Sequence, residues 1–354
     1  MNALTGGRAP AAPASSPASA SVPASVPASG GTGGTGRRFR LRGVTWLVWR
    51  QHRAAYWTVL ACTAMFTAWM LYRNALMTDH FVKVGGSGAA EEDRWEDSEP
   101  HLRALFDAAR ALGFVPVLAG VLLGAPLLAD DLEKGTAKLA LSQSVGRVRW
   151  LSVKLGLGAL VIAASTSVLA AVFGRWWRQA ASGGIVLPWA SGHAFDNTGP
   201  VPMALALFTA AGGMAIGLLL RRTLLAMVVT LGFAVAVQFA WSGVRLGLGN
   251  TVTVTTRDGA GLAQFPDLPE GAHQLSAAHL TASGELLDTA TCRTGQMGEP
   301  LAACLEAHRV VGWSVDYLPA SQMHGMQWLG AAVLLALTAA VTAFVFRRVR
   351  RHPL

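Results

Sequence analysis

The most varied side-chain chemistry in this chain lies in one short stretch, Leu128–Lys154, which reads LADDLEKGTAKLALSQSVGRVRWLSVK. It places three acids, a Gly-Thr pair and a cluster of bases between two long apolar runs. Glycine often ends a helix, so we expect a helix to end at Gly135. Threonine is a common N-cap, so we expect Thr136 to begin a short new helix over AKLAL. A short helix presented in this way suits docking into a partner's groove. The alternative is a basic, solvated loop that only fixes the topology of the chain.

Sequence signatures of catalysis are absent. There is no HExxH, no GxSxG and no GxxxxGK followed by Ser or Thr, and the three cysteines form no CxxC. GGTGGTG at Gly30–Gly36 has no following Lys-Ser/Thr pair, so we reject it as a phosphate loop. We therefore expect no catalytic, cofactor-binding or metal-binding residues. If the protein moves a solute uphill, the energy must come from another polypeptide.

The elements that must position this stretch are long and apolar. The chain is 52% hydrophobic and only 14% charged, whereas a soluble domain carries about 25% charge. Six runs without Asp, Glu, Lys or Arg each approach the ~20 residues with which a helix crosses a bilayer. Their number and length favour an all-α polytopic membrane protein over the buried helices of a soluble core. The expected spans are Ala54–Tyr72, Ala111–Ala129, Leu155–Phe173, Val201–Leu220, Leu224–Trp241 and Trp328–Phe346.

The distribution of charge predicts the orientation of these spans. Six spans place both termini on one side, and that side holds 18 of the 29 Lys and Arg but only three of the 20 acids. Short loops rich in Lys and Arg stay in the cytoplasm. We therefore expect a multi-pass protein of the plasma membrane, with both termini and the 130–154 connection inside. The bases flank apolar runs instead of forming one polar face, which argues against nucleic acid as a partner.

Composition also predicts how the rest of the chain is organised. Trp46 and Trp49 share one helical face, which favours a cytoplasmic interfacial helix over 37–53, with the end of the first spanning helix as the alternative. Pro, Ala, Ser and Gly dominate the preceding residues, a composition typical of disorder. The expected order is a disordered tail (1–36), the interfacial helix (37–53), spans one to five (54–241), an extracytoplasmic region (242–327), span six (328–346) and a basic cytoplasmic tail (347–354).

The region over 242–327 predicts a small mixed insertion between spans five and six. TVTVT at Thr251–Thr255 alternates like a short strand, and EPLAACLEAHR reads as a short helix with Pro300 in its first turn. Cys292 and Cys304 both lie in this region, where an oxidising compartment favours a disulfide. Two unpaired thiols are the alternative.

Small residues and prolines predict how the spans pack. Gly120 and Gly124 form one small-xxx-small pattern, and Gly213 and Gly217 form another, so helix backbones can approach closely at both. Pro116 and Pro126 flank the first pattern and should kink or break the second span. A span that bends during transport is the functional interpretation, and ordinary helix packing is the alternative. No span has an ionisable residue at its centre, so coupling to an ion gradient is disfavoured.

The opening stretch resembles the first cytoplasmic loop of ABC-2 type permeases. In that family a Glu-x-Gly-Thr pattern follows the second span, and a Pro-x-Ser-Arg-like turn and a Lys lead into the third. This chain has EKGT at Glu133–Thr136, followed by SVGR and LSVK, which supply Arg147 and Lys154. It departs from the pattern with Ser144 in place of Pro and Gly146 in place of Ser, which loosens the turn.

Other blocks resemble an actinobacterial branch of these permeases. WLVWRQHR before the first span is similar to the opening of that branch, and the block from FVPVLAG to LSVKLG resembles its second span and loop. VDYLPAS followed by QW is similar to its closing block. There the branch tends to have Arg and aromatics, where this chain has Gln322, Met323 and His324. The resemblance covers about 45–354 in organisation, and 242–327 matches weakly.

This resemblance implies a permease subunit of an ABC transporter, most often an exporter. Two such chains, as a homodimer or with a second permease, would line a pathway, and cytoplasmic ATP-binding subunits would dock at the 130–154 loop. ATP would be used by that partner, and this chain would carry no cofactor and no enzymatic site. The partner-coupling positions that the resemblance assigns are Glu133, Gly135, Thr136, Arg147 and Lys154.

Two other functions stay open at this point. The chain could be a membrane receptor or regulatory scaffold that binds a ligand through 242–327. An ATPase encoded beside it favours the permease, whereas a sensor kinase or regulator favours the receptor. An intramembrane enzyme is the third possibility, and the lack of ionisable residues at the centres of the spans argues against it.

Overall fold

The computed structural model describes residues 44–87, 91–135, 146–182, 187–259, 261, 264–293 and 301–351. Within these ranges six helical segments are long and apolar enough to cross a membrane, which confirms the predicted polytopic helical fold. They are Val48–Lys83, Glu99–Glu133, Val148–Ser182, Val201–Leu220, Thr223–Leu248 and Ala320–Arg351. The tail expected over 1–36 and the docking helix expected after Gly135 lie outside the described residues.

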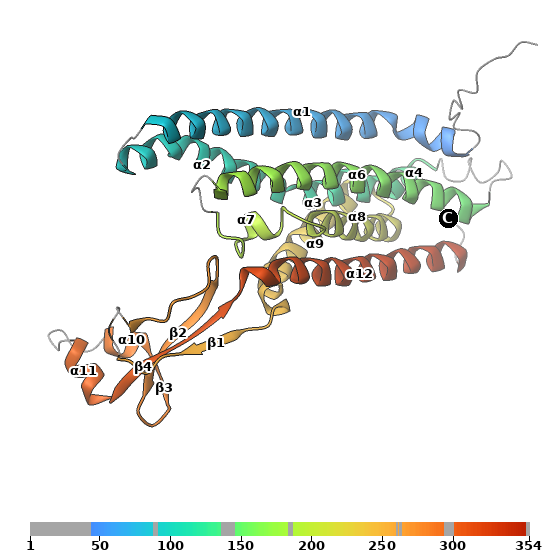
Figure 1. The fold of residues 1–354 in the computed structure, drawn as a ribbon. Helices are drawn as coiled ribbons and strands as arrows, with labels where there is room; N and C mark the ends of the chain where they lie inside the picture. The colour runs from blue at the N-terminus through green and yellow to red at the C-terminus, as the bar shows by residue number, and fades with distance from the viewer. Residues whose placement is uncertain are drawn as a thin grey trace, which may run out of the picture. The chain divides into compact units, whose positions relative to one another are not determined.

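The spanning segments are built from helices that run side by side (Figure 1). The first is α1 (Val44–Ser87), and the second span consists of α2 (Glu91–Gly113), α3 (Val115–Leu118), the π-helix η1 (Ala119–Gly124) and α4 (Ala125–Glu133). The others are α6 (Arg147–Ser182), α8 (Val201–Leu220), α9 (Thr223–Val244) with the 3-10 turn η2 (Arg245–Leu248), and α12 (Met323–Arg351) preceded by η4 (Ala320–Gln322). The short helix α7 (Gly192–Phe195) lies in the connection between α6 and α8.

α1 replaces the separate interfacial helix expected over 37–53. From Val44 onward these residues are the first part of α1, which passes Arg53 and Ala54 without a break. No Pro or Gly occurs between Val44 and Val84, so nothing in the sequence interrupts the helix there. The structure therefore agrees with the alternative, in which this segment is the end of the first spanning helix.

The insertion expected over 242–327 is shorter at both ends than predicted. α9 and η2 continue to Leu248, and η4 and α12 begin at Ala320. The predicted fifth span ended at Trp241, four residues before Arg245. In the structure Asp196 lies 2.6 Å from that guanidinium and neutralises it, so the helical segment continues. The basic tail expected from residue 347 likewise begins as the last turn of α12, which ends at Arg351.

α8 is the most enclosed of the spanning helices among the described residues. It contacts α12, α9, α6 and the segments of the second span. α9 and α1 instead expose large apolar side chains; Leu224 is 81% exposed, Phe239 75% and Met65 70%. Exposed apolar surface of this kind suits contact with lipid or with another membrane chain.

The second span is interrupted where two prolines predicted a kink. Phe114 forms a turn after α2, and α3 begins at once with Pro116 near its start. The π-helix η1 follows, and Pro126 lies in the first turn of α4. Proline removes a backbone donor and collides with the preceding turn, so the hydrogen-bond ladder must change at both sites. The hydrogen-bond pattern therefore changes in this span as predicted, while Phe114, Leu118 and Gly124 keep right-handed helical dihedrals and the segment continues as one span.

The two predicted small-residue patterns pack against each other. A Cβ built on Gly124 would lie 2.5 Å from the carbonyl oxygen of Ala210, and one built on Gly213 would lie 2.6 Å from that of Gly120. Gly217 is equally confined. Real side chains do not approach backbone oxygens this closely, so glycine is required for η1 and α4 to contact α8 as they do.

The insertion contains an antiparallel four-stranded sheet in the order β1-β4-β2-β3. Asp316 lies on the central strand β4 and accepts hydrogen bonds from Thr253 of β1 (2.5 Å) and Ser276 of β2 (2.8 Å). These bonds lower the pKa of Asp316, so its carboxylate links three strands as an anion. The strands are β1 (Val252–Thr255), β2 (His273–Thr281), β3 (Leu286–Asp288) and β4 (Val310–Leu318).

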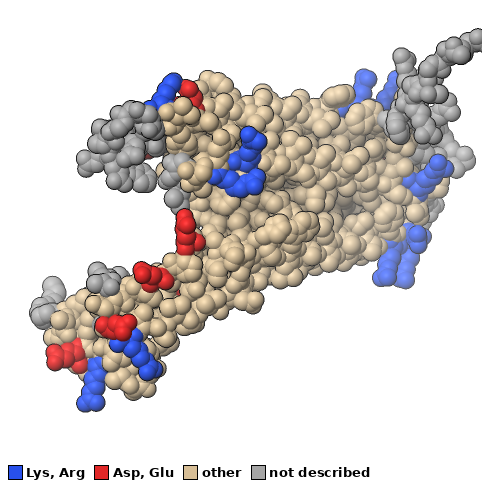
Figure 2. Space-filling model, viewed as in Figure 1, with Lys and Arg blue, Asp and Glu red and all other residues tan. Residues whose placement is uncertain are grey.

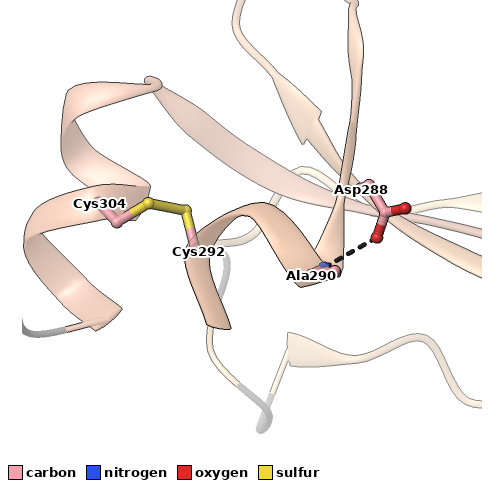
Figure 3. The surroundings of a disulfide bond; sticks show 4 residues. All are labelled: Asp288, Ala290, Cys292 and Cys304. Atoms are coloured by element: carbon pink, nitrogen blue, oxygen red, sulfur yellow. Dashed lines mark hydrogen bonds between the residues drawn. A yellow bond between two sulfur atoms is a disulfide. The ribbon is translucent and has the colours of Figure 1, made fainter. Parts of the chain in front are cut away.

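A disulfide joins two short helices of the insertion, α10 (Thr289–Arg293) and α11 (Leu301–Ala307) (Figure 3). Cys292 and Cys304 have Cα atoms 5.6 Å apart, within the usual range for a disulfide. Both cysteines are buried. The bond closes the chain around residues 294–300, which are outside the described part.

We expect Cys292 and Cys304 to resist a polar maleimide until the protein has been reduced, because neither sulfur is a free thiol. The measurement is mass spectrometry of the labelled protein, with and without prior reductant. A Cys62→Ala variant serves as the control, since Cys62 is a free cysteine within the first span. Label on the unreduced control protein would show that the disulfide is not formed.

Candidate functional site

The Glu133–Gly135 turn ends α4 and begins the polar connection to α6. Lys134 caps the helix, and its backbone N–H still donates to the carbonyl of Asp130 (3.0 Å). Gly135 has a φ of +66°, in the left-handed region that favours glycine after the last helical turn. The predicted helix end at Gly135 is therefore confirmed. A side chain at this position would strain the turn.

Glu133 ties this turn to a helix that is distant in sequence. Its Oε2 accepts a hydrogen bond from the backbone N–H of Thr223 (2.8 Å), the first residue of α9. The N-terminus of a helix presents unpaired N–H groups and a partial positive charge, so a carboxylate is well placed there. No sequence motif indicated this contact, because 90 positions separate the two residues.

Lys154 lies inside the bundle, although it was expected at the coupling surface. Its side chain is 0% exposed and pairs with Asp131 of α4, whose side chain is 2% exposed. Gln51 of α1 donates to the other oxygen of Asp131 (2.6 Å), and the Lys154 ammonium lies 5.0 Å from the Trp150 ring centroid. The ammonium is enclosed by the chain itself, so its role is to join α4, α6 and α1, and it presents no surface to a partner.

The structure brings four of the five predicted coupling residues to one end of the bundle, which we call the Glu133 end. Glu133 and Gly135 lie at its surface, whereas Lys154 lies within. Arg147 is the first residue of α6, and Thr136 is outside the described residues. Figure 2 shows Lys and Arg gathered at this end, beyond a broad band of uncharged side chains over the helices.

Electrostatics keep the surface of the turn charged. Lys134 pairs with Asp130 at 2.7 Å, one helical turn earlier. That hydrogen bond and the nearby carboxylate raise the pKa of Lys134, which favours the ammonium form. The Lys134 side chain is 65% exposed and that of Asp130 is 34% exposed, and a solvated pair of this kind contributes little to stability. Among the described residues no group of three His, Cys, Asp or Glu side chains is placed to hold a metal ion.

Two apolar cavities flank the π-helix η1. One, of about 250 Å³, is lined by residues that include Tyr56, Leu123 and Met214. The other, of about 370 Å³, lies between α1, α6 and the second span. Leu123 and Ile162 line both cavities, so these two side chains form part of the wall between them. Their largely apolar surfaces can accommodate hydrocarbon.

The six candidate spans define a polytopic helical membrane protein. At one end of its bundle, the polar Glu133–Gly135 turn is attached to α9 by a hydrogen bond. Over residues 60–245, just over half of its length, the chain matches the ABC-2 membrane transporter related family, and it belongs to that family. It is thus a membrane permease of the ABC transporter type, and such permeases pair in general with a cytoplasmic ATP-binding subunit. No curated protein and no solved structure matches the chain.

Proposed function

We propose that this chain is the membrane-spanning subunit of an exporter of the actinobacterial branch, driven by a separate ATP-binding subunit. The partner docks at the Glu133 end, on the 130–154 loop, and carries the ATP site. The excess of Lys and Arg in the short loops supports placing this end and both termini in the cytoplasm of a plasma-membrane protein. The insertion between spans five and six then lies outside.

The attachment of the Glu133–Gly135 turn carries this proposal. The turn continues α4 covalently, and it is hydrogen-bonded to α9 through Glu133 and Thr223. Just before it, Asp131 pairs with Lys154 of α6. A partner that displaces the turn therefore acts on three spanning helices together. A docking element needs this kind of rigid support if movement outside the membrane is to reach the spans.

The interrupted second span supports a bending role in transport. η1 lies between two prolines, and its hydrogen bonds differ from those of an α-helix. Two apolar cavities lie beside it, so the span has space into which it can bend. π-helical turns are frequent at functional sites. The apolar lining suits lipids, hydrophobic peptides or drug-like solutes. The exposed faces of α1 and α9 offer surface for a second permease, identical or not.

Substituting Glu133→Ala together with Thr136→Ala should weaken capture of the ATP-binding subunit by about tenfold, equivalent to ~1.4 kcal/mol of binding free energy. The measurement is a pull-down of the tagged full-length chain from its native membrane, with the ATP-binding subunit quantified by mass spectrometry. The variant should keep its elution volume in size-exclusion chromatography, because the Glu133 side chain is exposed at the end of α4.

Thr223→Pro is the matched control for this experiment. It removes the backbone N–H that donates a hydrogen bond to Glu133 but leaves the Glu133 carboxylate in place. Proline is favourable at the first position of a helix, and Arg222 before it is already extended, with φ −130° and ψ 119°. We expect this variant to capture the partner normally, because in this proposal the Glu133–Thr223 hydrogen bond transmits movement after docking and the Glu133 carboxylate remains available to the partner. Unchanged capture by the Glu133/Thr136 variant, or no ATP-binding subunit with the intact protein, would contradict the proposal, and the latter result would favour the receptor.

A further inference from the structure

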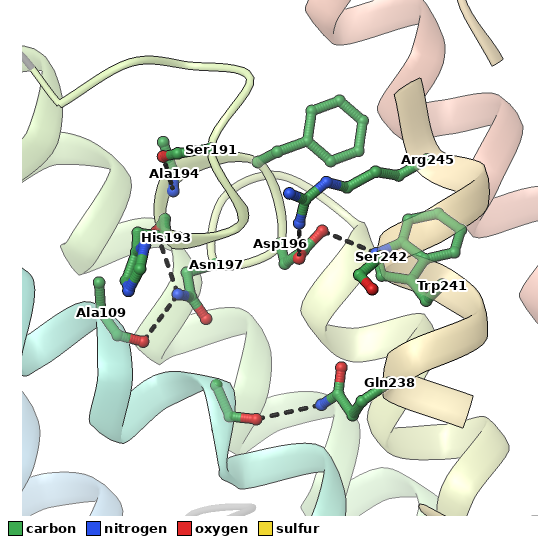
Figure 4. A network of polar contacts seen from close by, with 12 residues as sticks. Ala109, Ser191, His193, Ala194, Asp196, Asn197, Gln238, Trp241, Ser242 and Arg245 are labelled. Atoms are coloured by element: carbon green, nitrogen blue, oxygen red, sulfur yellow. Dashed lines mark hydrogen bonds and ion pairs between the residues drawn. The ribbon is translucent and has the colours of Figure 1, made fainter. Parts of the chain in front are cut away.

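A polar cavity lies between α2, α7 and α9, at the opposite end of the bundle from Glu133. Its volume is about 310 Å³. α7 and the loop after it supply one wall, and the end of α9 supplies another (Figure 4). Pro116 and Leu205 add apolar surface. The polar side chains around it are Arg110, His193, Asp196, Asn197, Gln238 and Arg245.

The one carboxylate that lines this cavity is already engaged at both oxygens. Asp196 accepts from a terminal nitrogen of Arg245 (2.6 Å) and from the indole N–H of Trp241 (2.7 Å). The amide N–H groups of the lining are used within the protein: Asn197 donates to the carbonyls of Ala109 and His193 (Figure 4), and Gln238 donates to the carbonyl of Gly113. Because both oxygens of Asp196 are engaged, a cationic ligand would find no unengaged carboxylate among these lining residues.

The guanidinium groups, in contrast, keep N–H donors available at the cavity. The Nε of Arg245 is buried and has no hydrogen-bond partner among the described residues. Arg110 makes only a long contact of 3.7 Å with Asp107, and both side chains are 67% exposed. Buried donors without a partner are costly, and exposed guanidinium groups are free to bind. Two guanidinium groups and one carboxylate leave the lining with net positive charge.

The pKa of His193 is affected by the same excess of positive charge. Burial lowers its pKa, and the nearby charges of Arg110 and Arg245 lower it further. The imidazole is therefore neutral at pH 7, with one ring nitrogen as a donor and the other as an acceptor. It adds polarity to the cavity without adding another charge.

We propose that this cavity binds the phosphate group of an anionic ligand, with Arg110 and Arg245 as its cationic contacts. Guanidinium groups match phosphate oxygens in geometry and charge. Arg110 directly precedes the apolar run that begins at Ala111, so the cavity lies where a spanning helix enters the hydrocarbon. A phospholipid whose acyl chains lie in the hydrocarbon would carry its phosphate group at this depth. A lipid and a free phosphate compound share the chemistry, and the experiment separates them.

Binding can be measured on the full-length protein with two probes. Inorganic phosphate is titrated calorimetrically into protein in a neutral detergent. In parallel, native mass spectrometry counts phosphatidylglycerol retained from nanodiscs that contain phosphatidylglycerol and phosphatidylcholine. We expect saturable binding of at least one probe, with phosphatidylglycerol alone indicating a lipid and inorganic phosphate indicating a soluble compound. Arg110→Ala should weaken that binding by about tenfold or more, as expected for loss of a charge-assisted hydrogen bond.

Arg103→Ala is the matched control. Arg103 is also on α2, is 73% exposed and pairs with Glu99, but it does not line the cavity. Its removal lowers the protein's net charge equally and should leave binding unchanged. Failure of both probes to bind would overturn the proposal. So would equal losses in the two variants, or full binding by Arg110→Ala.

Discussion

Replacing Lys154 with alanine should destabilise the folded chain by about 3–5 kcal/mol, the cost of removing one partner of a buried ion pair. The ammonium has no exposed surface, and it balances the Asp131 carboxylate between α4 and α6. Its loss leaves a buried negative charge without this counter-ion. The measurement is the loss of the folded peak in size-exclusion chromatography after heating in detergent, compared with the unchanged protein.

The double variant Lys154→Met with Asp131→Leu separates charge from packing. Replacement of both partners by apolar side chains is often neutral or stabilising, because neither charge must then be desolvated. We expect this variant to recover most of the stability that Lys154→Ala loses. If Lys154→Ala melts like the unchanged protein, the pair has no structural role. If the double variant folds but no longer captures the ATP-binding subunit, Lys154 contributes to coupling beyond stability.

The second large effect is expected at Gly124, where even one added methyl group has no room. A Cβ there would lie 2.5 Å from the carbonyl oxygen and 2.9 Å from the Cα of Ala210, and neither backbone atom can move without displacing α8. Gly124→Ala should therefore cost about 1–3 kcal/mol, in the range for overpacked cores. The same heating experiment in detergent measures this loss.

Gly156→Ala supplies a control of opposite sign. Gly156 is an exposed position in α6, and a Cβ there would have no neighbour within 4 Å. Alanine is the better helix former by about 1 kcal/mol, so this variant should be as stable as the original or more stable. Equal melting of the Gly124 and Gly156 variants would show that the close approach of the second span to α8 does not exist.

The spanning helices could be predicted from the sequence because long uncharged runs are local features. The ends of the helices could not be predicted in this way. A span is expected to end before a charged residue, but a helix continues through a charged residue whose side chain has a partner elsewhere in the fold. At the end of the fifth span, the helical segment continues through Arg245 as η2, and the partner of Arg245, Asp196, lies in the loop between α6 and α8. α1 likewise continues through Arg73, which donates to the carbonyl of Pro100.

The candidate site could be predicted only in part, because some of its residues act locally and others act through remote contacts. Gly135 acts through its own backbone, so its role as a helix end could be deduced. The contacts of Glu133 and Lys154 depend on helices that are remote in sequence. A local signal did exist for the buried pair: Asp131 follows the buried Leu127 and Leu128 at helical spacing. Lys154 follows Trp150 and Leu151 in the same way, so both charges belong to apolar faces.

The π-helix in the second span also has an arithmetic consequence. A π turn closes its hydrogen bonds over one more residue than an α turn, so η1 stores an extra residue within the helix. Each residue of an α-helix advances the chain by about 1.5 Å and turns it by about 100°. Gaining or losing that one residue would therefore rotate the Glu133 turn by about a quarter of a revolution relative to α2. The second span can therefore change by rotation of α4 relative to α2, as well as by bending.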